Sequence, residues 1–167
     1  MEAVGKRARG AGTIFLVGGA TAVLRGWRHS TIDVDIKADP EPAGLFEAIA
    51  AIKNELDINV ELASPDHFIP PLPGWRDRSL FVTQCNLVAF YHYDPYGQAL
   101  SKLARRHDRD LRDVRSMLAD GLIGLAELWN FFERIEPQLI RYPALDALKF
   151  RAAVFEFVSN PEGGNTP

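Results

Sequence analysis

Residues 31–37, with the sequence TIDVDIK, constrain the fold of this 167-residue chain more than any other segment. Apolar and polar residues alternate strictly there, and in a β-strand residues two apart lie on the same face. The apolar residues therefore point to one face, and Asp33 and Asp35 point to the other. The segment predicts a half-buried strand that presents two carboxylates on its polar face, about 6.5 Å apart along the chain.

A second feature precedes this strand. Residues 13–17 (TIFLV) favour a strand, which ends at Gly18-Gly19, and residues 20–27 favour a short helix. Glycine lets backbone N–H groups approach a phosphate closely, because no Cβ is in the way. On its own a glycine pair is more often only a turn.

Paired carboxylates on one strand face repel each other unless solvent or cations lie between them. Mg²⁺ binds oxygen ligands and retains waters that phosphate groups can replace. Two such ions can stabilise the attacking and leaving oxygens of a phosphoryl transfer. The alternative for Asp33 and Asp35 is a strand with one solvated polar face.

The remaining chain is expected to add strands and then helices only. An alternating segment and a hairpin supply strands, and residues 63–78, rich in proline and glycine, form an irregular loop. The order indicates an α+β fold, with a small mixed sheet flanked by helices and a helical C-terminal part. We expect a core over 1–94, a helical subdomain over 95–160 and a disordered tail over 161–167. The expected elements are helix 41–55, strand 57–62, hairpin strands 79–84 and 87–93, and helices 95–118, 122–135 and 144–158.

Composition excludes several classes of protein. The chain is 47% hydrophobic and 25% charged, and its one cysteine, Cys85, cannot form an internal disulfide. No apolar run approaches the roughly 20 residues that span a bilayer, and no signal peptide is evident at the N-terminus. We therefore expect a cytoplasmic protein with no membrane partner.

The glycine turn and the acidic strand together resemble a known signature. Val17-Gly18-Gly19, thirteen residues, and then Asp33-Val34-Asp35-Ile36 resemble the DNA polymerase β-like nucleotidyltransferase superfamily. The string LVGGATAVLRGWRHSTIDVDI is most similar to the bacterial and archaeal branch that contains abortive-infection toxins. The resemblance implies Mg²⁺-dependent (or Mn²⁺-dependent) transfer of a nucleoside monophosphate from an NTP to a hydroxyl. It also implies that Gly18, Gly19, Thr31 and Arg28 bind the nucleotide phosphates.

The superfamily adds a third acid from a neighbouring strand. Glu61, between Val60 and Leu62, resembles that position, and Asp57 on the same strand face is the second choice. The resemblance implies that Asp33, Asp35 and Glu61 are both catalytic residues and metal ligands. An exposed edge-strand charge is an equally good explanation of Glu61.

A single helix over 96–118 would gather five basic residues in one arc. A solvated charged face explains such an arc without any ligand. The segment is also similar to a K-L…R-D-x-x-D helix of the toxin-related branch, which implies that Lys102 contacts phosphate and that Asp110 supports the site. The basic residues of the arc are Lys102, Arg105, Arg106, Arg109 and Arg112.

The sequence leaves the acceptor open. A tRNA end, another RNA, a protein side chain and an antibiotic all carry hydroxyl groups that such chemistry could use. The resemblance suggests the toxin of a toxin–antitoxin pair. The alternative is an inactive nucleotidyltransferase fold that binds a nucleotide, an antitoxin or a second copy of the chain through its C-terminal helices.

Overall fold

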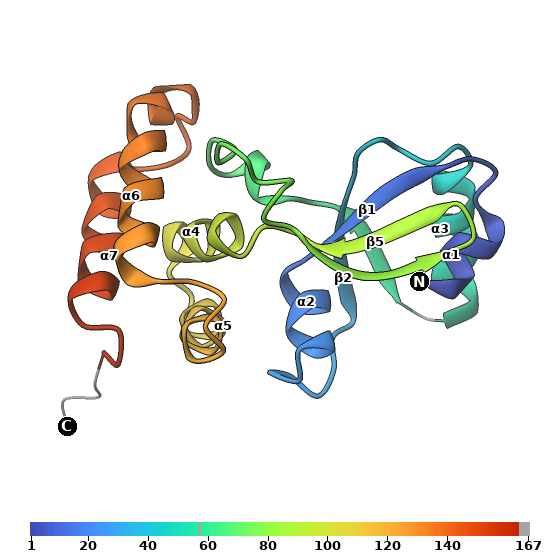
Figure 1. The fold of residues 1–167 in the computed structure, drawn as a ribbon, viewed down its shortest axis with the longest axis horizontal. Helices are drawn as coiled ribbons and strands as arrows, with labels where there is room; N and C mark the ends of the chain where they lie inside the picture. Colours follow the sequence, from blue (N-terminus) through green and yellow to red (C-terminus); the bar gives the residue numbers. More distant parts are fainter. Residues whose placement is uncertain (57, 164–167) are drawn as a thin grey trace. The chain divides into compact units, whose positions relative to one another are not determined.

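The computed structural model describes residues 1–56 and 58–163 (Figure 1). The chain forms two compact units. The first contains residues 1–64 and 76–94, and the second contains residues 65–75 and the chain from Pro95 onward. Each unit is described by itself below.

The first unit is built on a five-stranded mixed sheet with the order β3-β2-β1-β5-β4. Neighbouring strands run antiparallel in the pairs β1–β2 and β4–β5, and parallel in the pairs β1–β5 and β2–β3. The α+β fold class expected from the sequence is confirmed, as is the hairpin of β4 and β5. The strands are β1 (Gly12–Val17), β2 (Asp33–Ala38), β3 (Asn59–Leu62), β4 (Leu80–Cys85) and β5 (Val88–His92).

One face of this sheet carries the apolar core. Ile36 on β2 is 3% exposed, whereas Asp33 on the same strand is exposed, so within β2 the alternation corresponds to a buried and an open face. Ile32, which was expected on the buried face, precedes the strand and is 74% exposed. The helices of this unit are α1 (Glu2–Arg7), α2 (Gly18–Leu24) and α3 (Leu45–Leu56). The core cluster consists of Ile14, Leu16, Ala20, Ile36, Leu45, Ile49, Val88 and Phe90.

Helix α1 was not expected from the sequence. It contacts α3 and β4, and its one buried residue is Gly5. A Cβ built on Gly5 would lie 2.4 Å from the Cβ of Cys85 and 2.5 Å from the Cys85 carbonyl oxygen. Glycine, a poor helix former, is required here because the helix approaches the β4 backbone closely.

The second unit is helical. No helix in the described part of the chain combines the length and apolar character needed to cross a membrane. The elements are η1 (Pro65–His67), α4 (Pro95–Arg105), α5 (Asp108–Ala119), α6 (Leu125–Ile135), η2 (Glu136–Arg141) and α7 (Ala147–Ser159).

The expectation of one continuous helix over 95–118 is wrong. Arg106 adopts a left-handed conformation with φ of 57°, and its N–H donates to the Lys102 carbonyl oxygen at 3.0 Å, which closes α4. His107 is extended, and α5 begins at Asp108. The five basic residues therefore do not share one helical face, and the predicted basic arc is wrong as well.

Candidate active site

The glycine turn meets the second aspartate of the acidic strand. In the antiparallel pairing of β1 with β2, Val17 lies opposite Asp35, and Gly18 follows Val17 directly. Gly18 has φ of 55°, and a Cβ there would lie 2.9 Å from the Asp35 Oδ2 atom. Glycine is therefore needed at this position both for its backbone conformation and for the close approach of the carboxylate.

Gly19 is matched to Thr31 in the same way. A Cβ on Gly19 would lie 2.5 Å from Thr31 Oγ1. That hydroxyl donates to the Asp33 carbonyl oxygen at 2.9 Å, so Thr31 holds the first residue of β2 in position. The absence of a side chain at both glycines therefore allows β2, and Thr31 before it, to lie close to the turn.

Glu61 joins the two aspartates through the parallel pairing of β2 with β3. Asp33 is in register with Asn59, and Asp35 is in register with Glu61. Residues in register, and residues two apart on one strand, point to the same side of a sheet. The three carboxylates therefore share the sheet face opposite the core.

Asn59 connects two of these acids and was missed at the sequence level. Its Nδ2 donates to Asp33 Oδ1 at 3.3 Å and to Glu61 Oε1 at 2.6 Å. The signal that could have identified it is its position two residues before Glu61, on the same strand face. The amide NH₂ group lies between two carboxylates, whose negative charges also favour a positively charged group or ion at this point.

The donor set has the right chemistry for a hard divalent cation. Carboxylate oxygens are the ligands that Mg²⁺ and Mn²⁺ prefer. Among residues 1–56 and 58–163, no three His, Cys, Asp or Glu side chains converge closely enough to hold a metal ion as they stand. The carboxylates of Asp33, Asp35 and Glu61 fit such an ion chemically. In this structure the Asn59 amide bridges two of them, Asp33 and Glu61. Asp57, the second choice for the third acid, lies outside the described residues.

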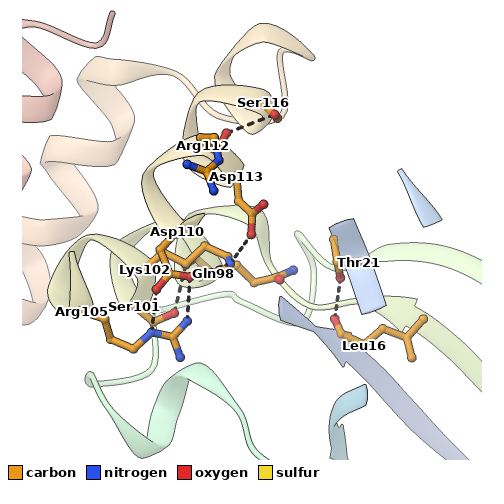
Figure 2. Close-up of polar contacts among 10 residues, drawn as sticks. All are labelled: Leu16, Thr21, Gln98, Ser101, Lys102, Arg105, Asp110, Arg112, Asp113 and Ser116. Carbon is orange, nitrogen blue, oxygen red and sulfur yellow. Dashed lines mark hydrogen bonds and ion pairs between the residues drawn. The ribbon is translucent and has the colours of Figure 1, made fainter. Parts of the chain in front are cut away.

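A buried histidine contacts the helix that begins at the glycine turn. His92, 6% exposed at the end of β5, places Nδ1 at 3.2 Å from the Thr21 hydroxyl of α2. That hydroxyl donates its one proton to the Leu16 carbonyl oxygen at 3.0 Å, a contact drawn in Figure 2. With the Thr21 hydroxyl directed at Leu16, the tautomer of His92 that carries its proton on Nδ1 donates to Thr21. The network ties β1, α2 and β5 together beside Gly18-Gly19.

The environment keeps His92 neutral. Burial lowers the pKa of the imidazole from 6.5 to about 4, and the nearby Arg25 guanidinium adds to the shift. No pattern in the sequence singled out this histidine. Its importance depends on Thr21, which lies 71 residues away along the chain.

Lys102 lies in the helical unit, and its ammonium is paired. It is 3% exposed, and its Nζ lies 3.1 Å from Asp110 Oδ1 and 2.6 Å from Asp113 Oδ2 (Figure 2). Arg105 also donates to Asp110, from Nε and Nη2, both at 3.2 Å. In this structure the Lys102 charge is therefore neutralised by the α5 carboxylates, and Asp110 has a direct supporting role toward it.

These ion pairs account for the break between α4 and α5. In a straight helix, Lys102 and Asp113 would be about 16.5 Å apart along the axis. Folding α5 back on α4 brings both carboxylates of α5 to a buried ammonium, which would otherwise be costly to desolvate.

Arg28 follows α2 and is half-buried, and its backbone N–H donates to the Ala22 carbonyl oxygen at 3.3 Å. The structure thus brings Gly18, Gly19, Thr31 and the acids of β2 and β3 together within the sheet unit. Lys102 and Asp110 form an ion-paired cluster within the helical unit.

The comparisons with known proteins gave one match. A family model described as "Nucleotidyltransferase of unknown function (DUF6036)" covers residues 1–160. Searches of curated proteins and of solved structures found no significant match.

Proposed function

We propose that this chain, which belongs to the DUF6036 family of nucleotidyltransferases of unknown function, transfers a nucleoside monophosphate from an NTP to an acceptor hydroxyl. One observation carries the proposal. The register of β2 and β3 places Glu61 beside Asp35, while the Asp35 carboxylate lies against the glycine turn. Three acids and a glycine turn on one sheet face are the groups that a divalent cation and its bound phosphates would need.

The proposed reaction is an in-line displacement at the α-phosphorus. The acceptor oxygen forms a bond to phosphorus, the bond to the β-phosphate oxygen breaks, and pyrophosphate leaves. Glu61, which is exposed, is the proposed base that accepts the proton of the attacking hydroxyl. Gly18 and Gly19 are proposed to present backbone N–H groups to the triphosphate.

Asp33, Asp35 and Glu61 are the residues that would hold Mg²⁺ or Mn²⁺. Such ions, when bound, neutralise phosphate charge and stabilise the attacking and leaving oxygens. Asp33 and Glu61 would each release the Asn59 amide to become ligands. Thr31 keeps the start of β2 in place while they do so.

A direct test uses each of the four NTPs labelled at the α-phosphate, with Mg²⁺ and with RNA or protein as acceptors. We expect label transfer by the wild-type chain and at least a hundredfold loss in Asp33→Asn/Asp35→Asn. Asp77→Asn changes an exposed aspartate of the same unit and is the matched control. Transfer that survives the double substitution would refute the proposal.

A second candidate is a module that binds nucleotide without transferring it. The Asn59 amide favours it, because this group stands between Asp33 and Glu61 at hydrogen-bond distance. Stabilisation of the chain by NTP and Mg²⁺ in a thermal-shift assay, with no label transfer to any acceptor, would support this candidate over the first.

The resemblance to abortive-infection toxins supports a cellular role as the toxin of a toxin–antitoxin pair. Under this proposal, induced expression of the wild-type chain arrests growth, and expression of Asp33→Asn/Asp35→Asn does not. Equal growth of the two strains at matched protein levels would remove this role.

A further inference from the structure

The helical unit contains a cavity of about 450 Å³ that no part of the proposed transfer reaction uses. All of its lining residues belong to this unit. They come from the end of α4, from residues around η1, and from the last residue of η2 and the segment after it. The cavity is large enough for a small ligand of a few hundred Å³. The lining residues that the argument uses are Phe68, Arg105, Arg141 and Tyr142.

The cavity offers aromatic surface held in fixed positions. Phe68 leaves 44% of its surface exposed, a large fraction for a phenylalanine ring. The Arg105 guanidinium lies over that ring, 5.6 Å from its centroid. Tyr142 donates from its hydroxyl to the Asp66 carbonyl oxygen at 3.2 Å, and burial raises the pKa of this phenol. The tyrosine therefore remains a protonated, anchored donor.

Two arginines place positive charge at the same cavity. Arg105 is held by Asp110 through two hydrogen bonds at 3.2 Å. Arg141 is exposed, and its guanidinium makes no ion pair or hydrogen bond to any residue within 1–56 and 58–163. An anion bound at this cavity would therefore meet an uncommitted, bidentate donor.

We propose that this cavity binds a nucleotide unit, with the base against Phe68 and Tyr142 and the phosphate on Arg141. Flat rings beside arginines are the combination that holds single nucleotides of an unpaired strand. A purely apolar ligand would leave the Arg141 guanidinium without a partner, and a simple anion would make no use of the rings. The nucleotide can be free or part of a single-stranded polynucleotide.

The proposal concerns binding alone and does not depend on the transfer reaction. Without an NTP or a metal ion no transfer can occur, so binding measured under those conditions tests the cavity and leaves the carboxylate site untested. Fluorescence polarisation with the full chain, in EDTA, would use a labelled single-stranded RNA of about eight nucleotides, with unlabelled AMP as the competitor.

The variants Phe68→Ala and Arg141→Ala test the two parts of the cavity. Loss of one stacked base weakens binding roughly fivefold to a hundredfold in Phe68→Ala. Loss of one phosphate contact reduces the slope of log affinity against log salt by about 0.7 in Arg141→Ala. The matched controls in the same unit are Phe155→Ala, which changes a phenylalanine 61% exposed on α7, and Arg109→Ala, which changes an exposed arginine on α5.

A free nucleotide and a single-stranded polynucleotide are expected to give different results in this assay. Displacement of the RNA by AMP at a similar concentration indicates a free nucleotide, and RNA that binds at least about tenfold more tightly than AMP indicates a polynucleotide. Either result supports the cavity when Phe68→Ala and Arg141→Ala weaken binding and the controls bind as the wild type does. The proposal is overturned if neither probe binds the wild-type chain, or if Phe155→Ala and Arg109→Ala weaken binding as much as the cavity variants. Arg141 is exposed, so its substitution tests the proposal even if Phe68→Ala does not fold.

Discussion

Acidification is expected to destabilise the sheet unit through His92. The folded structure lowers the pKa of His92 from 6.5 to about 4, mainly by burial and then by the charge of Arg25. Protonation is therefore less favourable in the folded chain than in the unfolded chain. The stability from neutral His92 is fully present above the unfolded pKa and is lost as the pH falls from about 6.5 toward about 4.

The size of the effect follows from the shift. Each pKa unit corresponds to about 1.4 kcal/mol, so the full shift sets an upper bound of about 3.4 kcal/mol. At about pH 5, the dependence of stability on proton binding gives a loss of about 2 kcal/mol in the free energy of unfolding. Partial solvation of the ring reduces the expected loss to between about 1 and 2 kcal/mol.

The assay compares the wild-type chain with His92→Gln. Urea unfolding followed by circular dichroism at several pH values gives the free energy of unfolding of each. At about pH 7.5 the variant should be less stable by about 1–2 kcal/mol, because it loses packing and the hydrogen bond to Thr21. Toward about pH 5 this difference should shrink by about 1–2 kcal/mol, since only the wild type must protonate a buried imidazole.

Subtraction of the two curves removes the contribution of every other titrating group. His29→Gln changes an exposed histidine of the same unit and is the control. A difference between wild type and His92→Gln that stays constant across this pH range would refute the assignment of the acid sensitivity to His92.

Three further outcomes follow from the same structure. Lys102→Met should destabilise the helical unit by about 3–5 kcal/mol in chemical denaturation, because two buried carboxylates lose the Lys102 ammonium and only Asp110 keeps the hydrogen bonds from Arg105. A loss below about 1 kcal/mol would mean that Asp110 and Asp113 are solvated. Gly18→Ala should displace the Asp35 carboxylate and lower the free energy of unfolding by about 1–3 kcal/mol. Label transfer should fall as well, and unchanged transfer would contradict the close approach of the turn to Asp35. Gly5→Ala should cost more than Gly26→Ala when both are compared by thermal unfolding, because at Gly26 only the positive φ of 77° opposes a Cβ, which would meet nothing within 4 Å.

From β1 onward, the order of strands and helices in the sheet unit could be predicted because its signals are local. Alternation in 31–37 and the Asn86 turn each depend on a few neighbouring residues. The features that were missed depend on distant partners. Gly5 is needed in α1 because Cys85 lies against it, and the break after Arg105 depends on carboxylates eight and eleven residues beyond Lys102. The break itself carries neither glycine nor proline, so no local pattern marks it.

The placement of the carboxylates follows from the core rather than from the acids themselves. A shift of one residue in the pairing of β1 with β2 would move Ile36 out of the apolar cluster and turn Asp35 into it. Burial of an unpaired carboxylate costs several kcal/mol, and exposure of Ile36 adds a further loss. The observed register, with Leu16 opposite Ile36 and Val17 opposite Asp35, avoids both costs. The residues that pack the hidden face of the sheet therefore also decide that Asp35 lies beside Gly18 on the open face.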